Sequence, residues 1–297
     1  MLEKETLWQS ENWKNFQSLL GNDAFFIKDK EQKILIICKQ LLLGKTFLEI
    51  QRGNLTISLY EKIKTLAISK KAIFLRISPN QKLPSFLQKK SFPTNSYKFP
   101  TLTSIIDLKK TEEEIFSSMS QSGRRHIRLA RKKEVKIIFS QDTSSLAKLI
   151  REMSQKKGIK SHDALFFKKL LQTFSSQAFI LLAQVKQEII AGGIFIFSNQ
   201  GCTYLYGGSK SDYNHFHAPT LLQWEAIKYA KKSGKQFFDF LGIAPQEEKN
   251  HPWSKISQFK RKFKGQEITL EEEVEIPFNK MWFAFFRLAK KILNTIK

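Results

Sequence analysis

The chain has 297 residues, of which 41% are hydrophobic, a share that suits a folded protein with one large or two medium cores. Its 50 Lys and Arg against 27 Asp and Glu give a formal net charge of +23, which favours nucleic acid, an anionic membrane surface or a phosphorylated substrate as partner. A lysine-rich proteome is the alternative source of this charge, so charge alone does not choose a partner.

Cysteine usage and the N-terminus bear on the compartment. Cys38 and Cys202 both lie in apolar, strand-like runs, and two cysteines without a pairing framework indicate a reducing, cytoplasmic setting. Residues 1–14 contain glutamates and no continuous apolar stretch, so we expect no signal peptide. The sequence also lacks a run of about 18 apolar residues, which predicts no membrane-spanning helix.

Apolar spacing predicts the elements of the first half of the chain. Thr111, followed by three glutamates, is a strong helix start, because a hydroxyl cap and acidic residues both favour the first turn. We expect the helix from Thr111 to continue through 124–134, with a break at Gly123. Other helices are expected over 12–22 and 56–71, and strands over 24–29, 33–44, 72–78, 102–108 and 135–140.

The second half gives the clearest pattern. Two helices, over 144–157 and 163–174, precede three strands joined by the short turns Lys186–Glu188 and Asn199–Gly201, which indicates an antiparallel meander. The expected strands are 178–185, 189–198 and 202–209, followed by a helix over 219–233 and a strand over 237–243.

This order of helix, three-stranded meander, helix and strand is typical of an acyltransferase domain of the GNAT type, and the first half shows a rougher version of it. We therefore predict an α/β (α+β) protein with two tandem GNAT-like domains. The first is expected over 1–139, completed by the C-terminal segment 270–297, and the second over 140–269.

The residues by themselves offer little conventional catalysis. His215 and His217 lie on one side of an extended segment, but no cysteine or carboxylate cluster joins them, so a solvated loop is favoured over a metal site. Asp212 and Asp239 are candidate acid–base groups. Asp239, however, lies in an apolar strand, where its carboxylate can instead bind backbone amides.

The loop over 208–219 bears on the acyl donor. GNAT enzymes that use acyl-CoA hold its pyrophosphate with a glycine-rich loop at the start of a helix. Here the loop has no such glycine pattern, and Pro219 removes one amide from the helix start. Both observations count against CoA.

Several segments, in this order along the chain, resemble the FemABX family of aminoacyltransferases. Residues 6–21 resemble its Q-x-x-x-W-x-x-F element, and residues 100–108 and 123–135 resemble its strand ending in Asp-Leu and its R-x-x-I-R-x-A helix. The most recognisable block is 204–243, and "FKRKF" at 259–263 is similar to the family's Phe-Lys element.

The resemblance implies a twin GNAT-like fold and a reaction class. Members move an amino acid from aminoacyl-tRNA to an amine of the peptidoglycan stem peptide, which builds interpeptide bridges on a lipid- or UDP-linked muropeptide. The expected partners are therefore this muropeptide and aminoacyl-tRNA, a co-substrate, with no cofactor. The basic charge suits these polyanions, and an ester already activated on tRNA needs mainly positioning and charge stabilisation.

Carried over residue by residue, the resemblance implies catalytic roles for three residues. Lys260 would place a cation near the oxyanion that forms when the acceptor amine attacks the ester, and Phe259 would wall the site. An exposed lysine in a basic helix is the alternative for Lys260. Asp107 would receive the acceptor ammonium, or take its proton, and a structural aspartate at a strand end is the alternative.

Substrate-binding roles follow in the same way. Arg124 and Arg128, four residues apart on one helical face, would contact phosphate or tRNA, and a solvated basic face is the alternative. Tyr206, Gly207 and Gly208 would line a groove, since glycine permits a close approach of the backbone to a peptide. Core packing would equally explain Tyr206.

Two departures concern the acceptor phosphates. In the segment 158–167, His162 stands where the family often has an arginine, and a histidine would hold phosphate only weakly near neutral pH. After the N-terminal tryptophan, Asn15 and Gln17 stand where a lysine sometimes occurs, with Lys14 one step away. The acceptor-binding role given to His162 therefore stays an expectation.

The C-terminal segment 277–297 is amphipathic, with lysines opposite an apolar stripe. The stripe comprises Phe278, Met281, Trp282, Phe285, Leu288, Ile292 and Ile296. We favour its packing against the first domain over a peripheral contact with the membrane surface. Two other functions stay open for the whole chain, namely a GNAT-type N-acyltransferase with another acyl donor and a non-catalytic module that binds RNA or membrane.

Overall fold

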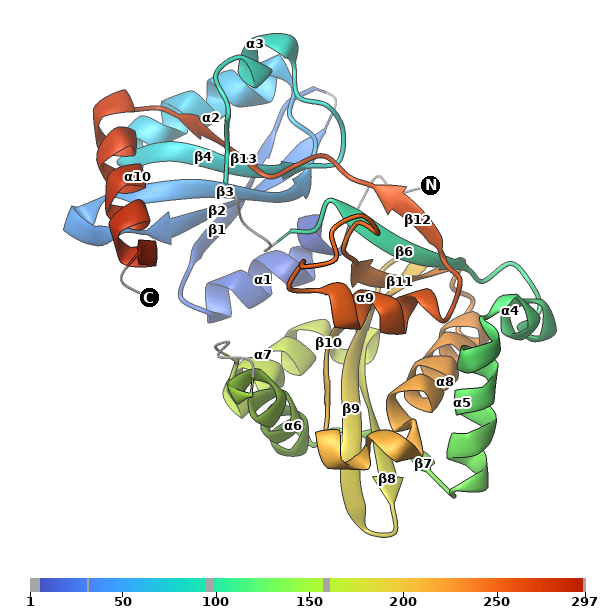
Figure 1. Ribbon diagram of the computed structural model, residues 1–297. Coiled ribbons are helices and arrows are strands. Elements are labelled where there is room, and N and C mark those ends of the chain that lie inside the picture. Colours follow the sequence, from blue (N-terminus) through green and yellow to red (C-terminus); the bar gives the residue numbers. More distant parts are fainter. Residues whose placement is uncertain (1–5, 31, 95–98, 157–160, 296–297) are drawn as a thin grey trace. The chain divides into compact units, whose positions relative to one another are not determined.

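The computed structural model describes residues 6–30, 32–94, 99–156 and 161–295. The chain divides into two compact units, Met1–Thr101 with Leu270–Lys297 (unit 1) and Leu102–Thr269 (unit 2), each built on its own sheet (Figure 1). Among the described residues, no helix is both long enough and apolar enough to cross a bilayer. Gly158, which lies between the helices predicted over 144–157 and 163–174, and the stripe residue Ile296 lie outside the described residues.

Unit 1 has a six-stranded sheet in the order β1-β2-β3-β4-β13-β5, antiparallel except for the parallel pair β3–β4. The strands are β1 (Asp23–Lys28), β2 (Lys33–Gln40), β3 (Thr46–Gly53), β4 (Ala72–Pro79), β5 (Phe92–Pro93) and β13 (Val274–Pro277). The helices are η1 (Leu7–Gln9), α1 (Glu11–Leu19), η2 (Leu42–Gly44), α2 (Ile57–Ser69), α3 (Ser85–Gln88) and α10 (Lys280–Thr295).

Local signals explain where the helices of unit 1 begin and which faces they bury. The Ser10 hydroxyl accepts from the Trp13 N–H and begins α1, and the Thr56 hydroxyl accepts from the Leu59 N–H and begins α2. Leu59 and Ile63, four apart on α2, are both fully buried against the sheet. The predicted strand over 33–44 is too long, because β2 ends at Gln40 and a 3-10 turn follows.

Unit 2 has a seven-stranded sheet in the order β12-β6-β11-β10-β9-β8-β7. The strands are β6 (Leu102–Asp107), β7 (Lys136–Ser140), β8 (Ala178–Val185), β9 (Glu188–Phe197), β10 (Gly201–Ser209), β11 (Phe237–Gly242) and β12 (Gln266–Thr269). The helices are α4 (Glu112–Ser118), α5 (Gln121–Lys132), α6 (Thr143–Gln155), α7 (Ala164–Phe174), η3 (Ser175–Gln177), η4 (Ser211–Phe216), α8 (Ala218–Lys232) and α9 (Ser254–Arg261).

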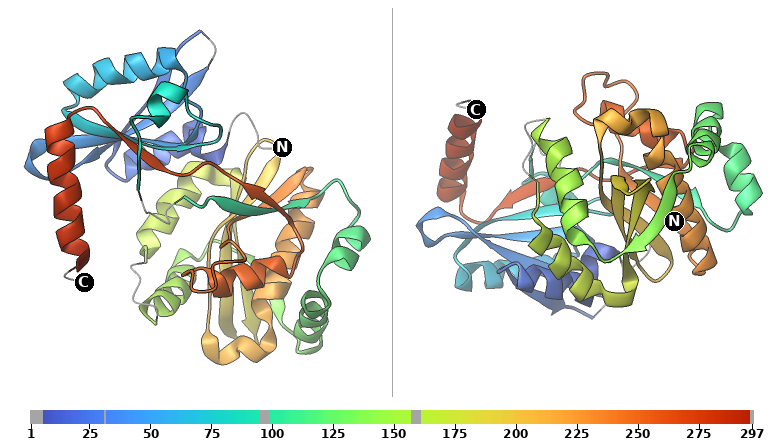
Figure 2. Two further views of the ribbon diagram at one scale, coloured as in Figure 1. Left: turned by 45° about the horizontal axis from the view of Figure 1, so that its top comes forward. Right: turned by 90° about the horizontal axis from the view of Figure 1, so that it is seen from below.

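The predicted meander is confirmed as β8-β9-β10, and its alternating side chains separate two layers of helices. Leu181 and Ala183 belong to the core cluster that includes α8, whereas the neighbouring Leu182 faces the side covered by α6. In Figure 2, α6 and α7 lie on one side of this sheet, and α5 and α8 lie on the other. The two-unit, mixed α/β architecture expected from the sequence is therefore present.

The predicted domain boundary at 139/140 differs from the one in the structure. Residues 102–139, expected in the first domain, belong to unit 2, because β6 pairs with β11 and β12, and β7 pairs with β8. The segment 270–297 groups with unit 1 through β13, which pairs with β4.

The break in the helix that was predicted at Gly123 lies at a different position in the structure. It falls between α4 and α5, at Met119 and Ser120, and not at Gly123. Gly123 lies inside α5, where a Cβ atom would come within 2.9 Å of the Lys262 carbonyl oxygen.

Candidate active site

The parallel strands β10 and β11 part soon after they meet. They pair only from Gly201↔Phe237 to Thr203↔Asp239, although both strands continue beyond these positions. Each strand carries an irregularity just past the last pair, at Tyr204–Tyr206 in β10 and between Asp239 and Gly242 in β11. The two strands therefore form a wedge at their carboxyl ends, which is where open α/β sheets commonly bind ligands.

Asp239 shapes the β11 side of this wedge. Leu241 has a left-handed backbone (φ 55°), and its N–H donates to Asp239 Oδ1 over 2.8 Å. The Thr103 hydroxyl donates to the same oxygen. Asp239 therefore binds the backbone of its own strand, the structural one of the two roles considered for it, and holds the irregularity that turns β11 away from β10.

Lys260, on α9, reaches the end of β11. Its Nζ donates to the Gly242 carbonyl oxygen over 2.7 Å, and the residue is only 7% exposed. Burial lowers the pKa of the Lys260 ammonium to about 8, against the opposing effect of the Asp239 carboxylate. The exposed basic-face alternative for Lys260 is therefore wrong, because this lysine is buried at the wedge.

Two further side chains of α9 hold the chain that follows β11. The Ser257 hydroxyl accepts from the Ala244 N–H over 2.7 Å and donates to the Trp253 carbonyl over 2.6 Å. The Arg261 guanidinium donates to the Ala244 carbonyl over 2.7 Å and pairs with Glu267. Because α9 holds both the N–H and the carbonyl of Ala244, two residues after Gly242, the position of Lys260 Nζ relative to the strand end is fixed.

Phe259 lies next to Lys260 but has a packing role in the structure. Its half-buried ring packs against the core of unit 2 and meets the Phe263 ring edge-on, with centroids 5.9 Å apart. This contact anchors α9 on the sheet. The predicted wall of the site stays a prediction.

Asp107 lies apart from Lys260. It is exposed at the far end of β6, where its carboxylate accepts from the Lys109 N–H over 3.0 Å. In the β6–β11 ladder Asp107 faces Phe237, whereas Thr103 faces Gly242. Four residues of strand separate the two positions by about 13 Å, so the structure does not bring these two predicted catalytic groups together.

Tyr206 and His162 meet on the β10 side. The Tyr206 ring lies edge-on to the rings of His162, Phe166 and Phe167, with centroids 5.6, 5.8 and 5.5 Å apart. Burial raises the pKa of Tyr206 to about 12, so its hydroxyl stays protonated. His162 stacks on Phe166 at 3.6 Å, and burial of its ring lowers the pKa, which leaves it a weak phosphate ligand at neutral pH.

Gly207 and Gly208 permit close approaches by the chain itself. A Cβ atom on Gly208 would come within 2.9 Å of the Leu149 backbone of α6, and one on Gly207 within 2.0 Å of the Tyr204 hydroxyl. The expected space for an acceptor peptide beside these glycines is thus already taken, on that side, by α6 and by Tyr204.

Arg124 and Arg128, both on α5, contact residues of the neighbouring helix α4. The Arg124 guanidinium donates to the carbonyls of Ser117, over 2.7 Å, and of Met119, at the end of α4. Arg128 lies over the Phe116 ring at 5.6 Å. Both arginines therefore pack on α4, and phosphate or tRNA contacts stay a prediction for them.

A pair of stacked histidines lies at the start of α8, and sequence reasoning missed it. The His126 and His217 rings stack at 3.9 Å, and Lys262 Nζ lies 3.3 Å from His126 Nδ1. Burial first, and Lys262 next, lower the pKa of His126 to about 4. The residues are 91 positions apart, so no local spacing could have indicated the contact. Among the described residues, no group of three His, Cys, Asp or Glu side chains could hold a metal.

The two N-terminal departures, Asn15 and Gln17, and the neighbouring Lys14 lie in unit 1. The Gln17 side chain is buried, and its Oε1 accepts from Asn22 over 3.0 Å and from Lys39 over 3.4 Å. Lys14 pairs with Glu11 at 3.4 Å, whereas Asn15 is exposed. Gln17 therefore has a structural role within unit 1.

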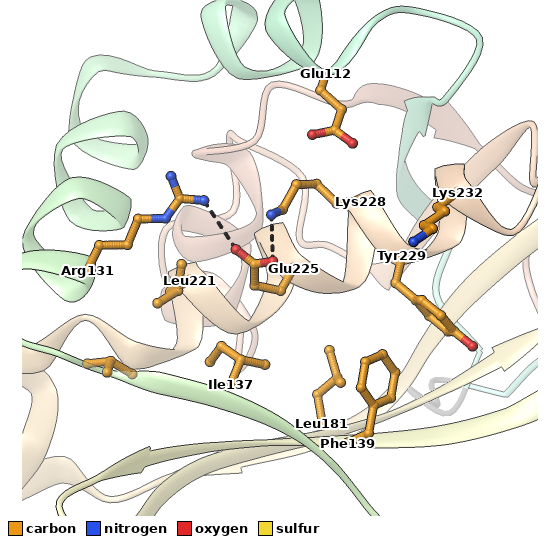
Figure 3. Close-up of a pocket in the computed structure, with 11 residues that line it drawn as sticks. Glu112, Arg131, Ile137, Phe139, Leu181, Leu221, Glu225, Lys228, Tyr229 and Lys232 are labelled. Atoms are coloured by element: carbon orange, nitrogen blue, oxygen red, sulfur yellow. Dashed lines mark hydrogen bonds and ion pairs between the residues drawn. The ribbon is translucent and has the colours of Figure 1, made fainter.

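A separate cavity of about 490 Å³ lies between α8 and the β7–β8 edge of unit 2 (Figure 3). Two carboxylates line it, Glu112 and Glu225, and Glu225 points to Arg131 at 3.2 Å and to Lys228 at 2.6 Å. Glu225 is thus paired with two cations, and the rest of the lining is mainly apolar, with Glu112, Tyr229 and Lys232 as its other polar residues. The wedge, with its buried lysine, is therefore the stronger candidate for chemistry.

Comparisons with known proteins show the family to which the chain belongs. The profile of the FemAB family matches residues 88–188 and 185–291, which include the wedge and α9. Aminoacyltransferase FemB of Staphylococcus epidermidis is 27% identical over 118 residues, which cover 39% of this chain and 28% of that protein. The chain thus spans little more than a quarter of the length of this curated relative.

Solved structures show the fold. A crystal structure of FemX superposes with a TM-score of 0.79 at 17% identity and covers 94% of each chain. A tandem GNAT protein from the clavulanic acid biosynthesis pathway superposes with a TM-score of 0.54 at 9% identity, over 87% of this chain and 83% of that one. The two units are therefore GNAT-like.

Proposed function

Because the chain belongs to the FemAB family, we propose that it is an aminoacyltransferase that moves an amino acid from aminoacyl-tRNA to the stem-peptide amine of a peptidoglycan precursor. The observation that carries this proposal is the family match across the wedge and α9, together with the buried Lys260 at the end of β11. The FemB relative, named an aminoacyltransferase, supports the same reaction class.

The proposed reaction replaces an ester with an amide. The acceptor amine attacks the carbonyl carbon of the aminoacyl ester, so a carbon–nitrogen bond forms and the carbonyl oxygen becomes negatively charged. When the intermediate collapses, the carbon–oxygen bond to the tRNA ribose breaks, and the ribose hydroxyl takes the proton that the amine loses. No protein nucleophile is required, because the donor arrives as an activated ester.

Lys260 suits the stabilisation of the charged oxygen. An ammonium held in a buried site interacts more strongly with a developing oxyanion than it would in water. Its Nζ has a fixed direction, since Ser257 and Arg261 tie α9 to the segment after β11. We propose that the carbonyl oxygen of the donor ester approaches Nζ from the wedge, beside the Gly242 carbonyl.

The acceptor would reach the wedge from the β10 side. Tyr206 keeps its proton, so it can donate a hydrogen bond to a peptide carbonyl, and the aromatic rings around it would exclude water. Asp107 lies too far along β6 to exchange a proton at Lys260. We propose that it receives, at most, a remote ammonium of the acceptor.

A transfer assay tests the proposal. The protein is incubated with radiolabelled aminoacyl-tRNA and with either a UDP-linked or a lipid-linked muropeptide, and acyl-CoA consumption is followed in parallel. Labelled amino acid is expected on one muropeptide. Consumption of acyl-CoA without any transfer from tRNA would favour the alternative N-acyltransferase, and the absence of turnover with every donor would favour a binding module.

A further inference from the structure

Helix α10 of unit 1 has two apolar faces, of which only one is buried. Phe283 and its neighbours Trp282 and Phe286 pack against Phe47 and Phe74 of the sheet. A second stripe faces outward, with exposed fractions of 74% for Met281, 57% for Phe285, 58% for Leu288 and 52% for Ile292. The spacing of four, three and four residues places these side chains on one line along the helix. The predicted single stripe is thus divided, and part of it has no cover.

Other exposed apolar residues lie beside α10. The tip of the β2–β3 hairpin exposes Leu42 by 87% and Leu43 by 71%, and the end of α2 exposes Ile68 by 82%. The hairpin is held at α10 because Lys45 lies 4.6 Å over the Trp282 ring, and Figures 1 and 2 show the hairpin tip next to α10 from each side. We call these residues, with the outward stripe of α10, the α10 face.

Leu43 is held in a strained conformation at this tip. Its φ of 58° is left-handed, a region that is unfavourable for a leucine and that glycine adopts freely. A leucine that is both strained and exposed contributes nothing to the core of unit 1. The conformation itself belongs to the hairpin turn, because Leu43 and Gly44 both have positive φ and the Lys45 N–H donates to the Leu42 carbonyl across them, as in a type I′ turn. The turn does not require a large apolar side chain at Leu43, which is left exposed for a contact outside the chain.

The groove between α2 and α10 places positive charge beside the α10 face. This groove, about 1240 Å³ in volume, has seven basic residues in its lining and one acidic residue, Glu61, which pairs with Lys64 at 2.9 Å. The other basic residues are Lys45, Lys71, Lys89, Lys90, Lys280 and Arg287. Of the exposed apolar residues, Ile68 belongs to this lining, so the basic groove adjoins the α10 face at the end of α2.

From this combination we infer that the α10 face docks unit 1 on an anionic lipid bilayer. Aliphatic side chains with a rim of lysines match the interface of an anionic membrane, where the apolar groups enter the acyl boundary and each basic residue near the leaflet strengthens binding about fivefold. RNA would satisfy the lysines but would leave Leu42, Leu43 and Ile68 in water. The inference does not rest on the proposed aminoacyl transfer, because lipid binding can be measured without it.

Vesicle flotation with the full chain tests this inference. The vesicles contain either phosphatidylcholine alone or equal parts of phosphatidylcholine and phosphatidylglycerol. We expect the chain to float with the anionic vesicles, more weakly at high salt, and to stay unbound with phosphatidylcholine alone. Absence of binding to the anionic vesicles at low salt would overturn the inference, and so would equal binding to both kinds.

Matched variants locate the binding surface. Phe285→Ser with Leu288→Ser is expected to lower the vesicle partition coefficient at least about tenfold, because two exposed apolar side chains are lost. Phe139→Ser with Leu165→Ser removes a phenylalanine and a leucine of equal exposure (59% and 56%) from unit 2 and is expected to change nothing. Equal partitioning of the two double variants would show that the α10 face is not the docking surface.

A third variant separates binding from folding. Leu43→Gly relieves the left-handed strain, so we expect its thermal unfolding midpoint to stay at or above that of the wild type while vesicle binding falls. Sedimentation without lipid completes the test. If the wild type forms a dimer that Phe285→Ser with Leu288→Ser dissociates, a second copy covers the face and the inference is wrong.

Discussion

The two units have related sheets, but their parallel strand pairs differ in how far the pairing extends along the strands. In unit 1, β3 and β4 pair at six positions from Thr46↔Ala72 to Gly53↔Pro79, so the pair stays closed along its length. In unit 2, β10 and β11 pair at three positions and then part. The same arrangement of meander, helix and parallel strand therefore yields a closed sheet in one unit and a wedge in the other.

The helices that follow β4 and β11 differ in the kind of side chain that they bury. After β4, the short helix α3 buries Leu87 completely, and the contact is purely apolar. After β11, α9 buries the ammonium of Lys260 against a strand-end carbonyl. A buried charge is expensive to maintain unless it is used or paired. Unit 1 also buries charged residues, such as Glu49 and Glu275, but Glu275 is paired with Arg76 and Glu49 accepts from Gln51. The cation at a strand end in unit 2 is the reason why we propose the chemistry there.

The largest expected effect comes from Lys260→Met. This change removes the cation with little change in side-chain length, and we expect the transfer rate to fall about 10²- to 10³-fold, as for the loss of one oxyanion donor. The free energy of unfolding should change by less than about 2 kcal/mol, because losing the donor to Gly242 is offset by removing a buried charge. Single-turnover kinetics and thermal unfolding measure both. An unchanged rate would remove Lys260 from the mechanism.

Arg76→Met should show the opposite behaviour in unit 1. Arg76 pairs with Glu275 at 2.6 Å across β4 and β13, and Glu275 is only 2% exposed. Removing the arginine leaves a buried carboxylate, so unfolding should become easier by about 3 kcal/mol, while kcat per folded molecule stays constant. Lys64→Met, which breaks an exposed pair with Glu61, is the control and should leave the unfolding midpoint unchanged.

The sequence predicts the features of the two units that depend on residues close together in the chain, and not those that depend on contacts between distant residues. Alternating apolar residues and the turn at Lys186–Glu188 were enough to predict the meander. The parting of β10 and β11 could not be predicted, because it depends on the left-handed Leu241 and on a hydroxyl from Thr103, more than 130 residues away in sequence. The domain boundary was wrong for the same reason, since the partners of β6 lie in β11 and β12.

The candidate site was predicted unevenly. The Phe-Lys element gave Lys260 from its likeness to a family, but nothing in its local pattern distinguishes it from the exposed lysines nearby. Its burial follows from the way α9 packs on the end of β11. The separation of Asp107 from Lys260 depends on strand register, which the sequence of β6 alone does not set.

Gly208→Ala and Gly207→Ala sharpen the account of the β10 side. A methyl group at Gly208 meets the backbone of Leu149, which cannot move aside, so we expect a loss of about 1–3 kcal/mol in the free energy of unfolding. At Gly207 a Cβ atom would come within 2.0 Å of the Tyr204 hydroxyl and 2.8 Å of two carbons of its ring, which packs on the core, so we expect a loss of similar size. Chemical denaturation measures both. If both variants instead fold normally and raise the KM for the muropeptide, the glycines serve the acceptor.

The smallest expected effect concerns Arg124→Met. Because its guanidinium caps the carbonyls at the end of α4, its loss should cost about 1 kcal/mol of stability and leave the KM for aminoacyl-tRNA unchanged. Arg125→Met, at an exposed neighbouring position, is the control. A raised KM for tRNA with unchanged stability would instead support the phosphate contact.

The pH dependence of transfer tests the central claim most directly, because the pKa of Lys260 lies near 8. If the ammonium is required, the single-turnover rate should fall as the pH rises through about 8, while the Lys260→Arg variant, slower overall, keeps its charge and shows no such fall. The free energy of unfolding should instead rise with pH between about 8 and 10.5. In that window Lys260 keeps its proton in the unfolded chain but has lost it in the folded protein, so deprotonation favours the folded state. A wild-type rate that does not fall above pH 8, or a fall shared by Lys260→Arg, would contradict the assignment of the wedge as the active site.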